Sequence, residues 1–168
     1  MKLITNLGGA DSPARTRAPE RGTFRVGAVQ TAWHRDAGEH RATLTAGVEL
    51  AARAGAQLVC LQELTLSPYF AIVPDGAEAL GVAAEPLPGG PTHAFAAELA
   101  ARFGLVVHAS LFEAAGEAEH PSVGAVPAGG GGFNTAIAVG PDGELLARTR
   151  KLHIPVTAGY YEDRYFAP

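Results

Sequence analysis

The chain has 168 residues, enough for one domain with a hydrophobic core; 47% of the residues are hydrophobic and 18% are charged. These proportions are typical of a globular protein and unlike those of a disordered one. The formal net charge is −4, and the arginines are scattered along the chain. We therefore expect no nucleic-acid partner and no binding to an anionic membrane surface.

The cysteine and histidine content restricts the chemistry further. Cys60 is the one cysteine in the sequence, which excludes an intramolecular disulfide and a multi-cysteine metal site. The histidines lack metal-ligand spacing, and no phosphate-binding or dinucleotide-binding glycine motif is present, so we predict no metal and no cofactor. No apolar run approaches the roughly 20 residues of a membrane span, and the first residues lack the basic flank and apolar core that would predict a signal peptide. A cytoplasmic location is the expectation.

The N-terminal region divides into two parts. Residues 1–22 mix Gly, Pro, Arg and Asp without apolar periodicity, which predicts a poorly ordered leader, with the domain itself over 23–168. Residues 24–30 (FRVGAVQ) are short, apolar and rich in valine, which predicts a buried strand.

A helix and a second strand follow. Asp36 precedes Glu39 by three residues, a capping-box-like pair, and Gly55 is a suitable residue to close a helix over 37–54. Residues 57–62 (QLVCLQ) then predict another buried strand. This β-α-β order predicts a parallel sheet with a right-handed crossover.

The rest of the chain continues the α/β pattern. The first elements expected are a long loop over 64–91, with room for one helical turn, and a helix opened by Gly90-Pro91-Thr92 and closed by Gly104. They are followed by a strand over 105–112, a flexible glycine-rich excursion over 113–132, and strands over 133–139 and 144–149. The turn between the last two strands contains Pro141-Asp142-Gly143, which is typical of a hairpin.

Two charged residues follow predicted strands. Glu63 comes at the C-terminal end of a buried strand, where open α/β sheets place their sites and where apolar surroundings suit a carboxylate to proton transfer. Lys151 follows the last predicted strand, and an ammonium there could stabilise an oxyanion. Taken singly, a solvated strand-end glutamate and a surface lysine are the simpler interpretations.

Together, the segments around these residues have a distinctive order. LVCLQELTLSPYF (58–70), FNTAIAVGPDGELLARTRKLHIP (133–155) and GYYEDRYF (159–166) resemble the nitrilase superfamily of carbon–nitrogen hydrolases. The resemblance is closest to the branch of N-carbamoylputrescine amidases and β-ureidopropionases, and it covers about residues 24–168.

The resemblance implies a Glu–Lys–Cys triad that cleaves a non-peptide C–N bond through a thioester. Glu63 matches the general base, and Lys151 matches the lysine that stabilises the oxyanion. Glu162 matches a second glutamate that positions the lysine and the substrate, although a solvated carboxylate is an equal alternative. Tyr69, Tyr160 and His153 are the expected substrate-pocket residues; for the two tyrosines, ordinary packing of loops is the other interpretation. The implied substrate is a small amide or N-carbamoyl compound.

The nucleophile is the point of departure from the family. In the family, the nucleophilic cysteine follows the lysine by a few tens of residues, and these 168 residues end before that point. Alternation of strand side chains puts Cys60 on the face opposite Glu63, so we expect Cys60 to be core packing. We therefore expect a truncated and inactive hydrolase, the N-terminal half of a four-layer α-β-β-α sandwich. A homo-oligomer or a complementing C-terminal half are the expected partners.

Two other functions fit parts of the sequence. A non-catalytic, degenerate homologue that binds or assembles with a complete paralogue would keep the same fold. A flavodoxin-like or Rossmann-like binding domain would need a cofactor loop after the first strand, but residues 31–34 (TAWH) contain no glycine.

Overall fold

The structure is a computed structural model that describes residues 1–6, 20–116 and 131–168. Its centre is a five-stranded sheet in the order β1-β2-β3-β4-β5. The strands are β1 Val26–Ala28, β2 Leu58–Cys60, β3 Val106–Ala114, β4 Gly132–Val139 and β5 Leu145–Arg150. The helices are α1 Ala37–Arg53, α2 Gly76–Ala79 and α3 Pro91–Phe103, with two 3-10 turns, η1 Phe70–Ile72 and η2 Glu162–Arg164.

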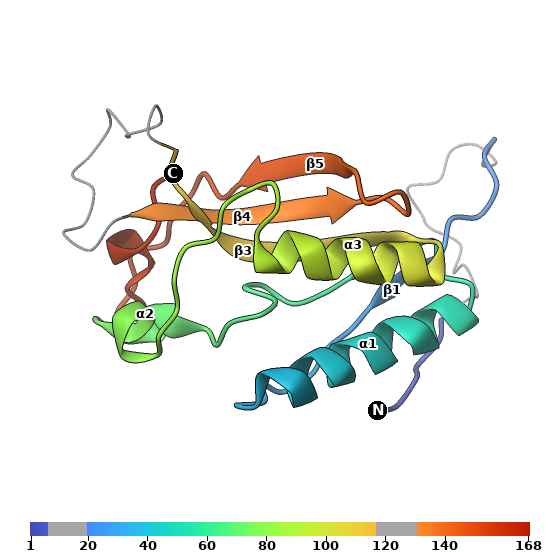
Figure 1. Cartoon of the computed structure of the whole chain (residues 1–168), viewed down its shortest axis with the longest axis horizontal. Helices are drawn as coiled ribbons and strands as arrows, with labels where there is room; N and C mark the ends of the chain where they lie inside the picture. Colours follow the sequence, from blue (N-terminus) through green and yellow to red (C-terminus); the bar gives the residue numbers. More distant parts are fainter. Residues whose placement is uncertain (7–19, 117–130) are drawn as a thin grey trace, which may run out of the picture.

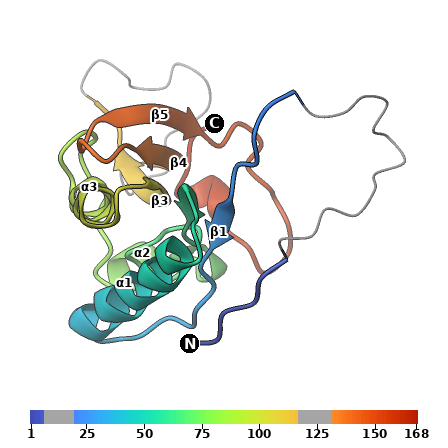
Figure 2. The same cartoon turned by 90° about the vertical axis from the view of Figure 1, so that its right-hand side faces the viewer.

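The sheet changes direction halfway across. The first three strands are parallel, and β4 and β5 are added antiparallel as a hairpin. The helices α1 and α3 form the two crossovers and lie on the same side of the sheet (Figures 1 and 2). The parallel strands therefore end at one common rim, and the loops after them can meet there.

The helix ends confirm the expected capping. The Asp36 carboxylate accepts a hydrogen bond from the Glu39 backbone N–H at 2.7 Å and so starts α1. Gly55 and Gly104 follow α1 and α3 with φ of 82° and 64°, a backbone conformation that costs other residues energy. These ends fix the lengths of both helices and hence where each chain segment re-enters the sheet.

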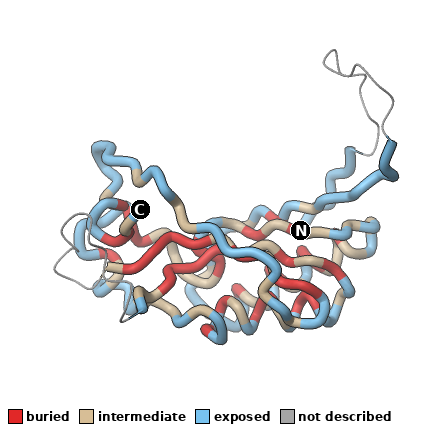
Figure 3. The backbone as a smooth tube through the Cα atoms, turned by 90° about the horizontal axis from the view of Figure 1, so that it is seen from above, coloured by how far each residue is buried: buried red, intermediate tan, exposed pale blue. Residues whose placement is uncertain are grey.

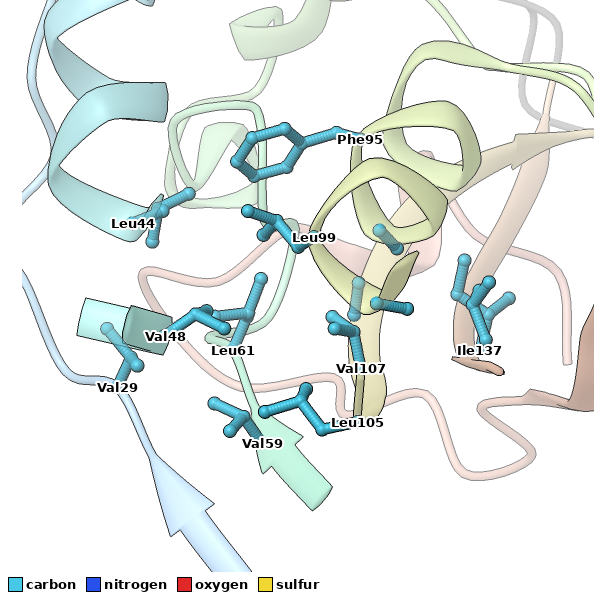
Figure 4. Packing of buried hydrophobic residues seen from close by; sticks show 14 of the residues in the cluster. Val29, Leu44, Val48, Val59, Leu61, Phe95, Leu99, Leu105, Val107 and Ile137 are labelled. Carbon is cyan, nitrogen blue, oxygen red and sulfur yellow. The ribbon is translucent and has the colours of Figure 1, made fainter. Parts of the chain in front are cut away.

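The main core lies between the helices and the sheet (Figure 4). Leu44 and Val48 from α1 and Leu99 from α3 are fully buried against Val59 and Val107 of the central strands. Burial of side chains of this size stabilises a fold by about 1.5–3 kcal/mol each. In Figure 3, the buried positions run along the central strands, and exposed residues make up the outer loops.

The position of Cys60 corrects the expectation of core packing. Val59 and Leu61 point into the core beneath the helices, so the alternation of a strand turns Cys60 toward the opposite face of the sheet. Cys60 is only half-buried there and is absent from both hydrophobic clusters of the described residues. Its burial is still sufficient to raise the pKa of the thiol.

A second hydrophobic cluster ties the C-terminal segment to the loop after β2. Its buried members are Leu64, Phe70, Ala71, Phe112, Tyr165 and Phe166. The Phe70 ring meets the Tyr165 ring edge-on with centroids 5.0 Å apart. The Tyr165 hydroxyl accepts from the Gly76 N–H at 2.6 Å and donates to the Val73 carbonyl at 2.5 Å. This cluster holds η2 beside the end of β2.

The prediction of a flexible excursion over 113–132 is wrong at both ends of that range. Strand β3 continues to Ala114 and β4 begins at Gly132, because Glu113 pairs with Phe133 and Ala114 with Gly132 across the sheet. The loop expected over 64–91 contains η1 and α2, so the helical turn that the prediction allowed there is present. Residues 117–130 of the excursion and 7–19 of the leader lie outside the described residues, so order in those segments stays a prediction.

A buried carboxylate explains the extension of β3. Glu113 is 2% exposed, and its oxygens accept hydrogen bonds from Arg150 at 2.7 Å, Arg148 at 3.3 Å and Thr135 at 2.5 Å. The Arg150 guanidinium also lies 3.6 Å from the centroid of the Phe133 ring. Because its oxygens contact both arginines and Thr135, the charged Glu113 carboxylate is tolerated inside the fold. These contacts also link β3 to β4 and β5.

Candidate active site

Three charged side chains from distant parts of the sequence meet at the rim of the sheet. Glu63 lies three residues beyond β2, Lys151 directly follows β5, and Glu162 opens η2. The Lys151 ammonium lies 2.5 Å from a Glu162 oxygen and 3.5 Å from a Glu63 oxygen. The structure therefore brings together the three residues that the sequence singled out.

The lysine is held from both ends. Its backbone N–H donates to the Asn134 carbonyl at 2.8 Å, which continues the β4–β5 pairing by one residue. Burial favours the neutral amine, but the hydrogen bond to Glu162 and the charge of Glu63 outweigh it and raise the pKa of Lys151. Lys151 therefore stays an ammonium at neutral pH, with its side chain still 32% exposed.

Glu162 is the buried member of the group. Its side chain is 4% exposed, and its second oxygen accepts a hydrogen bond from the Tyr69 hydroxyl at 2.5 Å. Burial, this hydrogen bond and the nearby carboxylates raise the pKa of Tyr69 well above the usual tyrosine value. With one oxygen on Tyr69 and the other on Lys151, Glu162 is suited to fixing the lysine rather than to accepting a proton.

Glu63 is more accessible and asymmetrically held. Its side chain is 45% exposed, and its Oε1 accepts a 2.6 Å hydrogen bond from the Asn134 side-chain amide in addition to facing Lys151. Among the residues that the structure describes, Oε2 has no hydrogen-bond or ion-pair partner. This oxygen is available to accept a proton from a group that approaches the site.

Asn134 and Ser110 are site residues that the sequence reasoning missed. Asn134 is 5% exposed, and its side-chain oxygen accepts from the Ser110 hydroxyl at 3.4 Å, which orients the amide toward Glu63. The available signal was a polar residue inside the otherwise apolar β4 segment FNTAIAV, because a buried amide requires partners.

The expected pocket residues have different outcomes. Tyr69 contacts the charged group directly. Tyr160 is 49% exposed and lies close enough to Tyr69 to contribute slightly to its raised pKa. His153 is exposed and has no hydrogen bond or ion pair within the described ranges. Contact with substrate stays a prediction for all three.

Other classes of site find little support. The described residues contain no group of three or more His, Cys, Asp or Glu side chains placed to bind a metal, and no helix among them is long and apolar enough to cross a bilayer. A cavity of about 700 Å³ lies elsewhere, between residues 1–6, β1 and α1. Because none of Glu63, Lys151 and Glu162 lines it, this cavity does not belong to the charged site.

The Tyr69–Glu162 contact makes a spectroscopic prediction. Absorbance titration of the 168-residue chain should show a tyrosinate signal that appears only well above the ordinary pKa of tyrosine, because ionised Tyr69 would face two carboxylates. Tyr69→Phe should remove this late signal, and Tyr160→Phe, at an exposed position, should retain it. A late signal that persists in Tyr69→Phe would contradict the contact.

A mixed sheet with a Glu–Lys–Glu group at its rim is the arrangement expected from the resemblance to the nitrilase superfamily. The model of the family described as Carbon-nitrogen hydrolase matches residues 25–168, and the chain belongs to this family.

Two plant proteins named as N-carbamoylputrescine amidases are similar to this chain. The chain is 34% identical over 143 residues to an N-carbamoylputrescine amidase of Solanum lycopersicum, a match that covers 85% of this chain and 43% of that protein. It is 33% identical over 145 residues to an N-carbamoylputrescine amidase of Oryza sativa subsp. japonica, with 85% and 42% covered. The chain thus spans less than half the length of these relatives.

Solved structures share the fold. A carbon-nitrogen hydrolase from Helicobacter pylori G27 superposes with a TM-score of 0.64 at 28% identity, over 86% of this chain and 44% of that one. An amidase from Nesterenkonia sp. AN1, carrying acrylamide on its active-site cysteine, superposes with a TM-score of 0.56 at 19% identity, over 87% and 50%. These matches confirm the expected fold class: the five-stranded sheet and its helices correspond to about half of each larger nitrilase-type chain.

Proposed function

We propose that this chain supplies the proton-transfer and oxyanion-stabilising groups of a carbon–nitrogen hydrolase acting on an N-carbamoyl amine or a linear amide. The observation that carries the proposal is the contact of one ammonium, Lys151, with two carboxylates, Glu63 and Glu162. The named activity of the plant relatives supports the N-carbamoyl class.

In the first half of the reaction, Glu63 acts as the general base. Its Oε2 takes the proton of a cysteine thiol, and the thiolate forms a bond to the substrate carbonyl carbon. The Lys151 ammonium stabilises the negative charge that develops on the carbonyl oxygen. Glu63 then gives the proton to the departing nitrogen, the C–N bond breaks, and a thioester remains.

The second half uses the same groups on water. Glu63 takes a proton from a water molecule whose oxygen attacks the thioester carbonyl, and Lys151 again stabilises the oxyanion. The C–S bond breaks, Glu63 returns the proton to the thiolate, and the acid leaves. From an N-carbamoyl amine this acid is a carbamic acid, which decomposes to carbon dioxide and an amine or ammonia.

We further propose that the thiol comes from residues outside these 168. Cys60 is the one cysteine in the sequence, it is half-buried, and burial raises its pKa, which disfavours the thiolate that attacks. Glu63 and Lys151 therefore have no nucleophile to activate within the chain by itself. A family C-terminal portion, joined or in complex, would provide it.

Ammonia release tests the proposal. Residues 1–168 would be followed by the C-terminal portion of the Solanum lycopersicum relative, a fusion called here the completed chain, and assayed with N-carbamoylputrescine and acetamide. The completed chain should release ammonia from at least one of them. Residues 1–168 alone, and a completed chain with the added cysteine changed to alanine, should release none.

A folded completed chain that releases no ammonia would contradict the proposed hydrolase. If residues 1–168 also co-purified as a stable chain with a complete family member, the non-catalytic assembly partner would be the better account. Ammonia release by residues 1–168 alone would contradict the external thiol.

A further inference from the structure

A buried histidine outside the charged group contacts the loop that carries Glu63. His40 lies in the first turns of α1, is 1% exposed, and packs against the Trp33 ring with centroids 4.2 Å apart. Its Nε2 lies 2.9 Å from the backbone carbonyl of Thr65, which is buried and two residues beyond Glu63. This contact joins the helix layer to the rim of the sheet.

The loop needs such support because its backbone is strained. Leu64, between Glu63 and Thr65, has φ of 50°, and it is the one non-glycine residue with positive φ in the described parts of the chain. A leucine rarely adopts this left-handed conformation, which persists only where neighbouring contacts enforce it. The direction of the Glu63 side chain depends on this turn.

The contacts that hold the turn come from two sides. From the sheet, the Ser110 backbone carbonyl accepts from the Thr65 N–H at 2.8 Å, and the Ser110 N–H donates to the Thr65 hydroxyl at 3.0 Å. From the helix layer, His40 reaches the Thr65 carbonyl. The side-chain amide of Gln62, in the segment after β2, makes a longer 3.4 Å contact with the same carbonyl. Thr65 is therefore clamped between β3 and α1.

The contact also defines the tautomer of His40. A carbonyl oxygen only accepts hydrogen bonds, so the 2.9 Å contact with Thr65 requires the hydrogen on Nε2, although the side-chain amide nitrogen of Gln62, a donor, also lies 3.4 Å from this atom. The Nδ1 atom is buried and has no hydrogen-bond partner among the described residues. A hydrogen on Nδ1 would therefore be an unsatisfied buried donor, which is costly.

We propose that His40 is a positioning residue for the general base: its Nε2–H holds the Thr65 carbonyl, fixes the strained turn at Leu64 and thereby aims Glu63 at Lys151. This inference rests on the proposed function, since it assigns His40 a task for the same site. His40 itself touches none of the reacting groups. The effect predicted for its loss is a displaced Glu63, with Lys151 and Glu162 left in place.

The first test needs no variant. Long-range ¹H–¹⁵N spectra of the ¹⁵N-labelled 168-residue chain report which ring nitrogen of each histidine carries the hydrogen. The expected result for His40 is the Nε2–H tautomer with a slowly exchanging proton. An Nδ1–H tautomer would overturn the proposal, because Nε2 would then have no hydrogen to donate to Thr65.

The second test measures the consequence at Lys151. The sequence contains two lysines, Lys2 and Lys151, so ¹³C-lysine labelling gives two Cε signals whose titrations are read separately. His40→Leu should lower the pKa of Lys151 as far as Glu63→Gln does. His40→Gln places an amide donor at similar reach and should restore the wild-type value.

The control is a core change in the same helix. Leu44→Ala removes a fully buried side chain of α1 and should destabilise the fold without altering the Lys151 titration. A His40→Leu chain with an unchanged Lys151 pKa, where Glu63→Gln lowers it, would overturn the positioning role alone. An unchanged pKa in Glu63→Gln itself would instead overturn the Glu63–Lys151 pair, and the proposed function with it.

Discussion

Glu63→Gln in the completed chain is expected to lower kcat/KM for N-carbamoylputrescine by roughly 10²- to 10⁴-fold, the usual contribution of a general base. The amide keeps the size of the side chain and can still contact Asn134 and Lys151, but it cannot take the proton of a thiol. The measurement is steady-state ammonia release at neutral pH.

The matched control is Glu98→Gln, the same change at an exposed position on the outer side of α3. It should leave kcat/KM unchanged. A Glu63→Gln chain with near wild-type kcat/KM would show that Glu63 does not transfer the proton.

Glu113→Ala is expected to lower the free energy of unfolding by about 3 kcal/mol, the lower end of the range for a broken buried ion pair. The change removes the buried carboxylate that contacts both Arg150, whose side chain is 20% exposed, and Arg148, whose side chain is 41% exposed. Urea unfolding of the 168-residue chain measures the loss. Glu144→Gln, at an exposed position in the β4–β5 turn, should change stability by less than about 0.5 kcal/mol.

The ion pairs of Glu113 with Arg148 and Arg150 also make the stability of the chain depend on pH. Burial opposes ionisation of Glu113, but the hydrogen bonds from Arg150 and Thr135 and the charges of both arginines outweigh it and lower its pKa. Stability from a carboxylate with a lowered pKa is present above the unfolded-state pKa and is lost as pH falls through the folded-state pKa. The difference in free energy of unfolding between wild type and Glu113→Ala should therefore become smaller at acidic pH. A difference that stays constant down to acid unfolding would contradict the ion pairs.

Local signals in the sequence predicted most of the fold. Short apolar runs indicated the strands, and Asp36, Gly55 and Gly104 indicated helix ends because caps and positive φ have strong local preferences. The first strand was wrongly expected to be buried, since Val26 in β1 is 60% exposed. The failures involve contacts between distant residues. Glu113 was placed in a flexible segment because its partners, Arg148 and Arg150, follow it by more than 30 residues.

The charged residues of the site were predicted from the sequence, but the residues that support them were not. Glu63, Lys151 and Glu162 were identified from the family resemblance, since each has an ordinary surface interpretation when taken alone. The supporting residues were not identified, because Asn134 reaches Glu63 only through the β3–β4 register and His40 reaches Thr65 only through helix packing. Cys60 was misplaced because periodicity shows that faces alternate but not which face the helices cover.

The most direct test of the account is the titration of Lys151 against Lys2 in the ¹³C-lysine-labelled 168-residue chain. If Glu63 and Glu162 flank the ammonium, Lys151 will lose its proton at higher pH than an ordinary lysine side chain, and Glu63→Gln and Glu162→Gln will each lower its pKa. Titration of both lysines together, unaffected by either substitution, would show that the two carboxylates and the ammonium do not form one site.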